Sequence, residues 1–102
     1  MNPNEASANK TYNITTNTTT VIPGKFVLVR IIVNKKGASS NIATIYDSTE
    51  ALGVNSDYKK GIVDTTDKVG NIECGFPVFN GIYIVTETGT APDLTVVYAE
   101  TP

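Results

Sequence analysis

The chain contains no histidine, no tryptophan and a single cysteine among its 102 residues. Without histidine it lacks the commonest general acid or base near neutral pH and the commonest metal ligand. Serine or cysteine nucleophiles that a histidine partner activates are therefore excluded. Cys74 has no partner for an internal disulfide, and the neighbouring Glu73 raises rather than lowers a thiol pKa. The sequence thus predicts a protein that is not an enzyme, with Cys74 as a small residue in or near the core.

Charge and long apolar segments are also scarce. Charged residues make up 18% of the chain, and the net charge is −2, so no basic surface for nucleic acid is expected. The longest apolar run, residues 26–33, is interrupted by Arg30 and is far shorter than the roughly 20 residues that cross a bilayer. No basic start followed by an apolar stretch suggests a signal peptide. We therefore expect synthesis in a cytoplasm and no membrane partner.

The carboxylates are scattered through predicted loops and match no metal-binding spacing. Those considered are Asp47, Glu50, Asp57, Asp64 and Asp67. Two or three of them could hold Ca²⁺, which takes loop oxygens as ligands, but loop carboxylates are more often only solvated. The glycines stand apart, and no helical pattern follows them, so a phosphate-binding loop is absent. We expect neither a metal nor a cofactor.

What the sequence does contain favours β-structure. Threonine, valine, isoleucine and asparagine dominate, and β-branched residues suit a pleated, half-buried surface. Seven or eight strand-like segments alternate with turn residues, at 12–16, 18–22, 25–34, 41–46, 62–63, 71–74, 82–87 and 94–100. No helical period is convincing, although residues 47–57 could hold one short helical turn. The pattern predicts an all-β fold, an antiparallel β-sandwich or a jelly-roll-like arrangement.

The boundaries of the domain and of two strands can also be predicted. Residues 1–11 are polar and have no hydrophobic period, so we expect an extended N-terminal arm followed by a single β-sandwich domain at 12–102. Such an arm is commonly disordered, and an arm held by a neighbouring subunit is the alternative. The strand that begins at Asn71 is expected to end before Phe76. Asn80-Gly81 favours a tight primed turn.

Residues 25–34 form the strongest strand signal and have two apolar faces. One face consists of Val27, Val29, Ile31 and Val33, and the other of Phe26, Leu28, Arg30 and Ile32. A sheet with one face in water should alternate apolar and polar residues, so the second face is predicted to be covered. Loops of the same chain are one cover, and another subunit is the other. In the latter case Phe26, Leu28, Arg30 and Ile32 form the interface, and Arg30 reaches a carboxylate of the partner.

Several short segments resemble small bacteriophage virion proteins. They are residues 33–35 (VNK) with 37–39 (GAS), 42–48 (IATIYDS), 79–85 (FNGIYIV) and 93–98 (DLTVVY). The resemblance covers about residues 22–99 and departs at 51–66, which are more polar and irregular. It implies a β-sandwich subunit of a phage particle, such as a head decoration (cement) protein. Proteins of this kind bind the outside of the capsid, bridge neighbouring major capsid subunits and are often dimers or trimers.

Three hypotheses for function follow. The first is a capsid decoration protein on the virion surface, a homo-oligomer that binds and stabilises the assembled capsid. The second is a neck, tail or fibre component of the virion. The third is a module that binds glycans or a host surface, although the chain lacks tryptophan and only Tyr58 lies in a clear loop.

Overall fold

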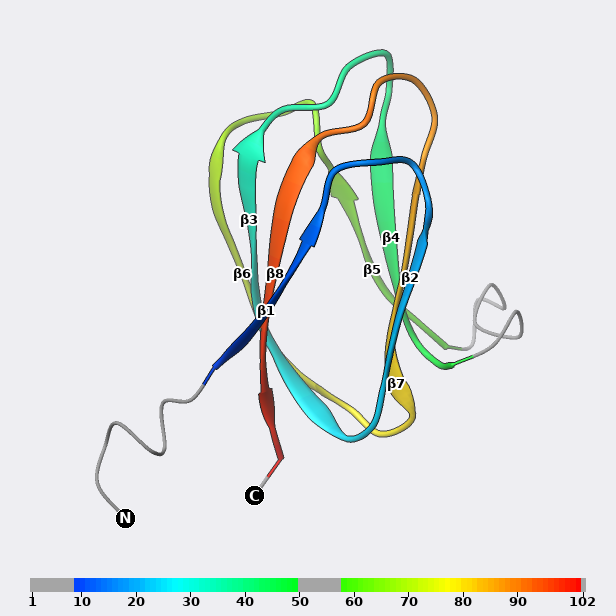
Figure 1. Ribbon diagram of the computed structural model, residues 1–102, viewed down its shortest axis with the longest axis vertical. Coiled ribbons are helices and arrows are strands. Elements are labelled where there is room, and N and C mark those ends of the chain that lie inside the picture. The colour runs from blue at the N-terminus through cyan, green and yellow to red at the C-terminus, as the bar shows by residue number, and fades with distance from the viewer. Residues whose placement is uncertain (1–8, 50–57, 102) are drawn as a thin grey trace.

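The computed structural model describes residues 9–49 and 58–101. Within these ranges the chain forms eight strands and no α-helix (Figure 1). The strands are β1 (Lys10–Ile14), β2 (Thr19–Pro23), β3 (Phe26–Lys35), β4 (Ile42–Asp47), β5 (Lys59–Asp64), β6 (Gly70–Val78), β7 (Gly81–Glu87) and β8 (Asp93–Glu100). The prediction of an all-β fold is confirmed.

The strands form two four-stranded antiparallel sheets that face each other in a sandwich-like arrangement (Figure 1). Sheet A has the order β1-β8-β3-β6, and sheet B has the order β2-β7-β4-β5. Strands from the two halves of the chain pair as β1 with β8, β2 with β7, β3 with β6 and β4 with β5. Successive pairs therefore alternate between the sheets.

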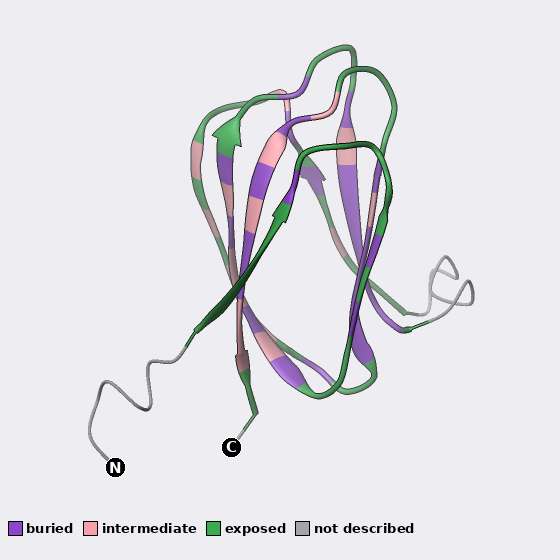
Figure 2. Cartoon of the chain, viewed as in Figure 1, coloured by how far each residue is buried: buried purple, intermediate pink, exposed green. Residues whose placement is uncertain are grey.

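The hydrophobic core lies between the two sheets, where buried residues alternate along the strands (Figure 2). This alternation follows from the two-residue period of a strand, which sends successive side chains to opposite faces. The completely buried apolar residues are Leu28, Ile31, Val33, Ala43, Val78, Ile82, Ile84, Leu94 and Val96. Burial of each large side chain among them contributes on the order of 1.5–3 kcal/mol.

Strand β6 extends beyond its predicted end. It runs through Phe76 and Pro77 to Val78, so the prediction of an end before Phe76 is wrong. The strand lies at the edge of sheet A and pairs only with β3. An edge strand leaves every second N–H outside the ladder, and proline is therefore tolerated there.

Strand β1 begins within the segment that the sequence assigned to the arm. Lys10 pairs with Tyr98, and its Nζ lies 2.6 Å from Glu100 Oε1. Residues 10–11 have no strand-like pattern of their own, and they become part of a strand only by pairing with β8. The sequence therefore predicted that the first strand starts at Tyr12. Residues 1–8 of the predicted arm lie outside the described residues, as does most of the segment 47–57 that was considered for a helical turn.

The turn between β6 and β7 is not of the predicted primed type. Neither Asn80 nor Gly81 has a positive φ, whereas a primed turn requires one. Instead, Asp47 at the end of β4 holds the turn, because its Oδ1 accepts hydrogen bonds from the backbone N–H groups of residues 79, 80 and 81 at 3.1, 2.8 and 3.3 Å. Gly81 is needed for space, since a Cβ there would lie 2.9 Å from the Ile22 carbonyl oxygen.

Asp47 makes the stability of the fold sensitive to acid. Burial by itself would raise the pKa of Asp47, but the three N–H donors and Lys60 lower the pKa below its ordinary value of 3.8. A carboxyl group with a lowered folded-state pKa contributes fully above its unfolded pKa and loses this contribution as the pH falls through the folded pKa. We expect the free energy of unfolding to decrease below about pH 4.

The variant Asp47→Asn tests this contribution. It is expected to lose on the order of 1–3 kcal/mol at pH 7, because a neutral amide accepts the same hydrogen bonds more weakly. It should also lose less stability than the native protein between pH 7 and pH 3. Urea denaturation at both pH values measures the difference, and an equal pH dependence in the two proteins would contradict the role of Asp47.

Candidate interaction surfaces

The four residues of the predicted interface do not share one face. Phe26 and Leu28 lie in the core, where their exposed fractions are 9% and 0%. Arg30 and Ile32 are half-buried and lie on the outer side of sheet A. The placement of Phe26 and Leu28 on a partner-facing surface is therefore wrong.

A β-bulge in β3 explains the error. The consecutive β8 residues Tyr98 and Val97 stand opposite Leu28 and Arg30, so Val29 is an extra residue on β3. A bulge of this kind reverses which residues face the core beyond it. Phe26 and Leu28 point inward before the bulge, and Ile31 and Val33 point inward after it. Almost the whole segment is apolar, so its sequence does not reveal the position at which the core-facing residues switch from even to odd numbers.

The outer side of sheet A carries half-buried apolar residues beside an ion pair. The register places Val27 opposite Ala99, and it places Arg30 between Val97 and Glu73. We call this surface the β3 face; its members are Val27, Arg30 and Ile32 of β3, Ala99 and the buried Val97 of β8, and Glu73 of β6.

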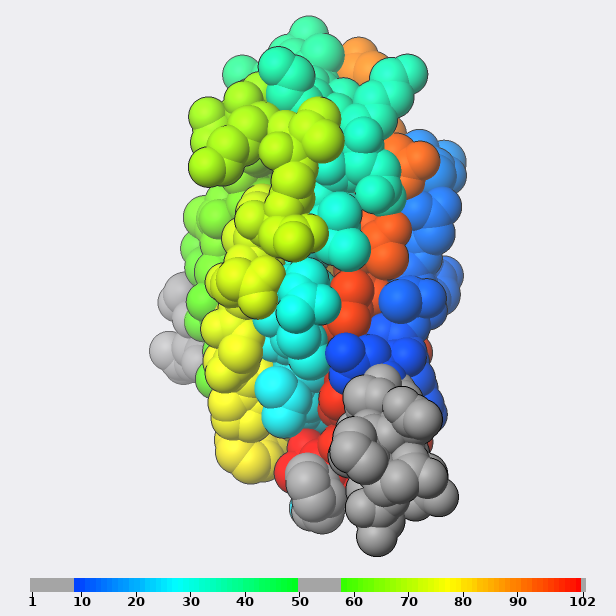
Figure 3. All heavy atoms as spheres, turned by 90° about the vertical axis from the view of Figure 1, so that its left-hand side faces the viewer, coloured from blue at the N-terminus to red at the C-terminus, as the bar shows by residue number. Residues whose placement is uncertain are grey.

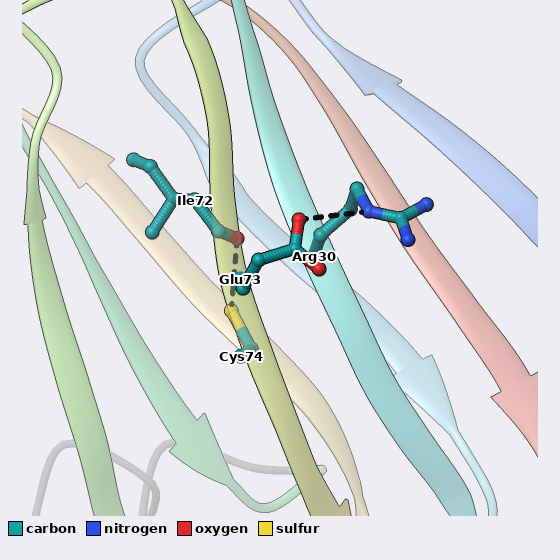
Figure 4. Close-up of polar contacts among 4 residues, drawn as sticks. All are labelled: Arg30, Ile72, Glu73 and Cys74. Atoms are coloured by element: carbon teal, nitrogen blue, oxygen red, sulfur yellow. Dashed lines mark hydrogen bonds and ion pairs between the residues drawn. The ribbon is translucent and has the colours of Figure 1, made fainter.

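The ion pair uses only part of the Arg30 guanidinium. Arg30 Nε lies 3.1 Å from Glu73 Oε2, and the two terminal nitrogens of Arg30 point away from that carboxylate (Figure 4). The pair is partly exposed to solvent, so it contributes at most about 1 kcal/mol to the stability of the monomer.

The same side of sheet A becomes polar toward the end of β3. Asp93 Oδ1 accepts hydrogen bonds from Asn13 Nδ2 and Asn34 Nδ2 at 2.8 and 3.1 Å. These two donors lower the pKa of Asp93, which is therefore charged at neutral pH. Asn34 Nδ2 also lies 2.8 Å from Thr95 Oγ1. The outer side of sheet A thus ends in a hydrogen-bonded polar cluster at this end of β3.

A second surface is formed by four loops that gather at the end of the sandwich away from the termini (Figure 1). We call it the loop end; it consists of residues 15–18, 36–41, 65–69 and 88–92. At its centre Asn41 is completely buried. Its Nδ2 donates to Asn17 Oδ1 and to the Thr88 carbonyl, both at 2.8 Å, and its Oδ1 accepts from Thr65 Oγ1 at 2.6 Å. One buried side chain thus links all four loops.

The exposed part of the loop end has a strained backbone. Ser39, Ser40 and Thr88 have φ values of 57°, 66° and 75°. This left-handed conformation costs a residue other than glycine about 1–2 kcal/mol, and it is rarest for β-branched residues such as Thr88. Such strain persists only where the surrounding structure enforces it, which is common at binding sites. The sequence does not reveal this surface, because serine and threonine in a loop carry no signal of a positive φ.

The residues considered for chemistry do not form a reactive site in the described part of the chain. Cys74 is half-buried against the core, as predicted, and burial together with Glu73 raises the pKa of its thiol. No three acidic or cysteine side chains of residues 9–49 and 58–101 are grouped so that they could hold a metal ion. Glu50 and Asp57 lie outside these ranges. Tyr58, the tyrosine expected in a loop, directly precedes β5 and is 41% exposed.

No helix in the described residues is long and apolar enough to cross a membrane. A comparison of the chain with protein-family models and with curated protein sequences gives no match.

Proposed function

We propose that this chain is a structural, non-enzymatic protein of a bacteriophage virion that binds the assembled capsid through its loop end. The observation that carries the proposal is the loop end itself. Its exposed residues Ser39, Ser40 and Thr88 have unfavourable conformations, and they adjoin a buried polar network in which Asn41 binds the Thr88 carbonyl. The partner in this proposal is the major capsid protein, and the location is the capsid surface.

The mechanism needs only rigidity and differential binding. Loops that are already fixed lose little conformational entropy when they bind, so more of the interaction energy remains as affinity. A protein that binds the assembled shell but not free subunits stabilises the shell by mass action. Neither step uses an acid, a base or a nucleophile.

The strand order supports the assignment of the sandwich as a jelly roll. Pairs β1·β8, β2·β7, β3·β6 and β4·β5 alternate between the two sheets, as in a long hairpin that has been rolled up. Jelly rolls are found in viral capsid and lectin domains. Fold alone does not establish function, but this fold agrees with the sequence resemblance to phage virion proteins.

Electron microscopy of the phage particle, with gold-labelled antibody against the purified chain, tests the proposal. Label over the whole head is the expected result. A single ring of label at the neck, or label on the tail, would favour the second hypothesis of a neck, tail or fibre component. Particles without label would overturn a role in the virion.

Variants of the exposed loop end test its contact with the capsid. The double variant Ser40→Arg/Thr88→Arg places two bulky charged side chains on this surface and should weaken binding to particles that lack the protein by at least about tenfold. Asn80→Arg, at the opposite end of the sandwich, is the matched control and should bind normally. Equal binding by both variants would exclude the loop end. Binding of the native chain to a glycan array, abolished only in the loop-end variant, would instead indicate a lectin.

A further inference from the structure

We propose that Asn80 is a site of spontaneous deamidation that the native fold keeps unreactive, with the carboxylate of Asp47 as the group that blocks the reaction. Asn80 is the only asparagine of the chain that is followed by glycine. This dipeptide reacts readily in a mobile chain, because glycine has no Cβ to hinder the approach of its own nitrogen to the asparagine side chain. The sequence therefore makes the site reactive, and the fold decides whether it reacts.

Deamidation begins when the Gly81 backbone nitrogen gives up its proton and attacks Cγ of the Asn80 side chain. A new bond forms between this nitrogen and Cγ, the bond from Cγ to Nδ2 breaks, and the side-chain nitrogen leaves as ammonia. Water then opens the resulting five-membered succinimide at either carbonyl carbon and produces aspartate or isoaspartate. The reaction needs only water, but it requires a free Gly81 N–H and a backbone that can rotate.

The Asn80 side chain lies where water can reach it. Residue 80 is exposed and follows directly on the last two residues of the β6 end, Val78 and Phe79. Figure 3 shows the end of β6 (yellow) on the surface at the lower end of the molecule. Access of water to Asn80 therefore does not limit the reaction.

The backbone on both sides of the reactive bond is held by other segments of the chain. Asp47 Oδ1 accepts hydrogen bonds from the nitrogens of Asn80 and Gly81 at 2.8 and 3.3 Å. The Asn80 carbonyl accepts a hydrogen bond from the Gly24 nitrogen, and the Gly81 carbonyl accepts one from the Ser48 nitrogen, both at 3.1 Å. Each backbone N–H and C=O of residues 80 and 81 thus has a partner. The rotation that would bring Cγ of Asn80 onto the Gly81 nitrogen breaks these hydrogen bonds.

The charge of Asp47 also opposes the first chemical step. Burial would raise the pKa of Asp47, but its N–H donors and Lys60 keep the pKa below 3.8, so the carboxylate is charged at neutral pH. Removal of the proton from the Gly81 nitrogen would create a second negative charge 3.3 Å from Asp47 Oδ1. A like charge at this distance disfavours the ionised form of the nitrogen.

The product of the reaction would not fit the native turn. Isoaspartate carries the main chain through one additional carbon, which displaces Gly81 from its pairing with Pro23 at the start of β7. Either product also adds a carboxylate to a residue whose backbone contacts Asp47. A molecule that has reacted once therefore cannot restore the turn.

The rate of deamidation at residue 80 tests the block in the purified full chain. Peptide mapping by mass spectrometry measures this rate at neutral pH in the native chain and in the chain unfolded in guanidinium chloride. Deamidation requires local opening of the turn, so the native chain should react at least about 100-fold more slowly. Equal rates in the two states would overturn the proposal, and this comparison needs no variant.

Two variants separate the effect of Asp47 from that of overall stability. Asp47→Ala removes hydrogen bonds to a charged acceptor and should accelerate the reaction at least about tenfold. Leu94→Ala is the matched control, because it truncates a completely buried side chain near the loop end, and it should leave the rate unchanged. Circular dichroism and urea denaturation verify that both variants are folded. If Asp47→Ala does not fold, Asp47→Asn takes its place, and the mapping separates the new asparagine from Asn80.

Two outcomes of the variant experiment would overturn the role of Asp47. Equal acceleration by Asp47→Ala and Leu94→Ala would assign the protection to global stability. A slower reaction in Asp47→Ala would show that the carboxylate assists the reaction as a base. All measurements use the chain without capsids, so they are independent of the test of capsid binding.

Discussion

Leu28→Ala is expected to lower the free energy of unfolding by about 3–5 kcal/mol, whereas Ile32→Ala should lower it by less than about 1.5 kcal/mol. Leu28 is completely buried between the sheets, so its truncation loses transfer free energy and leaves a cavity. Ile32 lies on the outer side of sheet A and is already partly in contact with water. Removal of its side chain leaves no closed cavity.

The comparison is a direct test of the bulge in β3. A regular strand sends residues 28 and 32 to the same side, so the two truncations would then have similar costs. The bulge between Leu28 and Arg30 places them on opposite sides. Urea denaturation of both variants gives the two free energies. Equal losses would contradict the bulge.

Gly89→Ala is expected to destabilise the protein by about 2–5 kcal/mol. Gly89 has a φ of 64°, and a Cβ there would overlap the carbonyl oxygens of Ala38 and Ser39. The overlapping atoms belong to the backbone of the neighbouring loop, which is tied to Thr90 by hydrogen bonds of 3.1 and 3.0 Å. The clash can therefore be relieved only if the loop end opens.

Gly61→Ala is the matched control for this substitution. Gly61 lies in β5, has no positive φ and has open space where a Cβ would be added. Alanine should therefore be neutral or stabilise by up to about 1 kcal/mol. Thermal or urea denaturation measures both variants, and capsid binding should fall only for Gly89→Ala. A Gly89→Ala protein as stable as the native chain would show that the loop end is not rigid.

The sequence by itself determined the class of fold and excluded a catalytic histidine. Strand-like alternation and β-branched composition are local properties, so the all-β fold and the number of strands could be predicted from them. The near-core position of Cys74 followed from its small apolar character and its neighbour Glu73. The absence of histidine was likewise evident without any structure.

Only the tertiary structure decided which surfaces are formed. The side of β3 that faces the core changes at Val29, because Val29 is an extra residue with no partner on β8. Strand β6 continues through Pro77 because it lies at the edge of sheet A. The β6–β7 turn is set by Asp47 of another strand, and the loop end is organised by Asn41 through groups that are 24 and 47 residues away. These features depend on which distant segments meet. The local sequence of a strand or loop does not specify these long-range contacts.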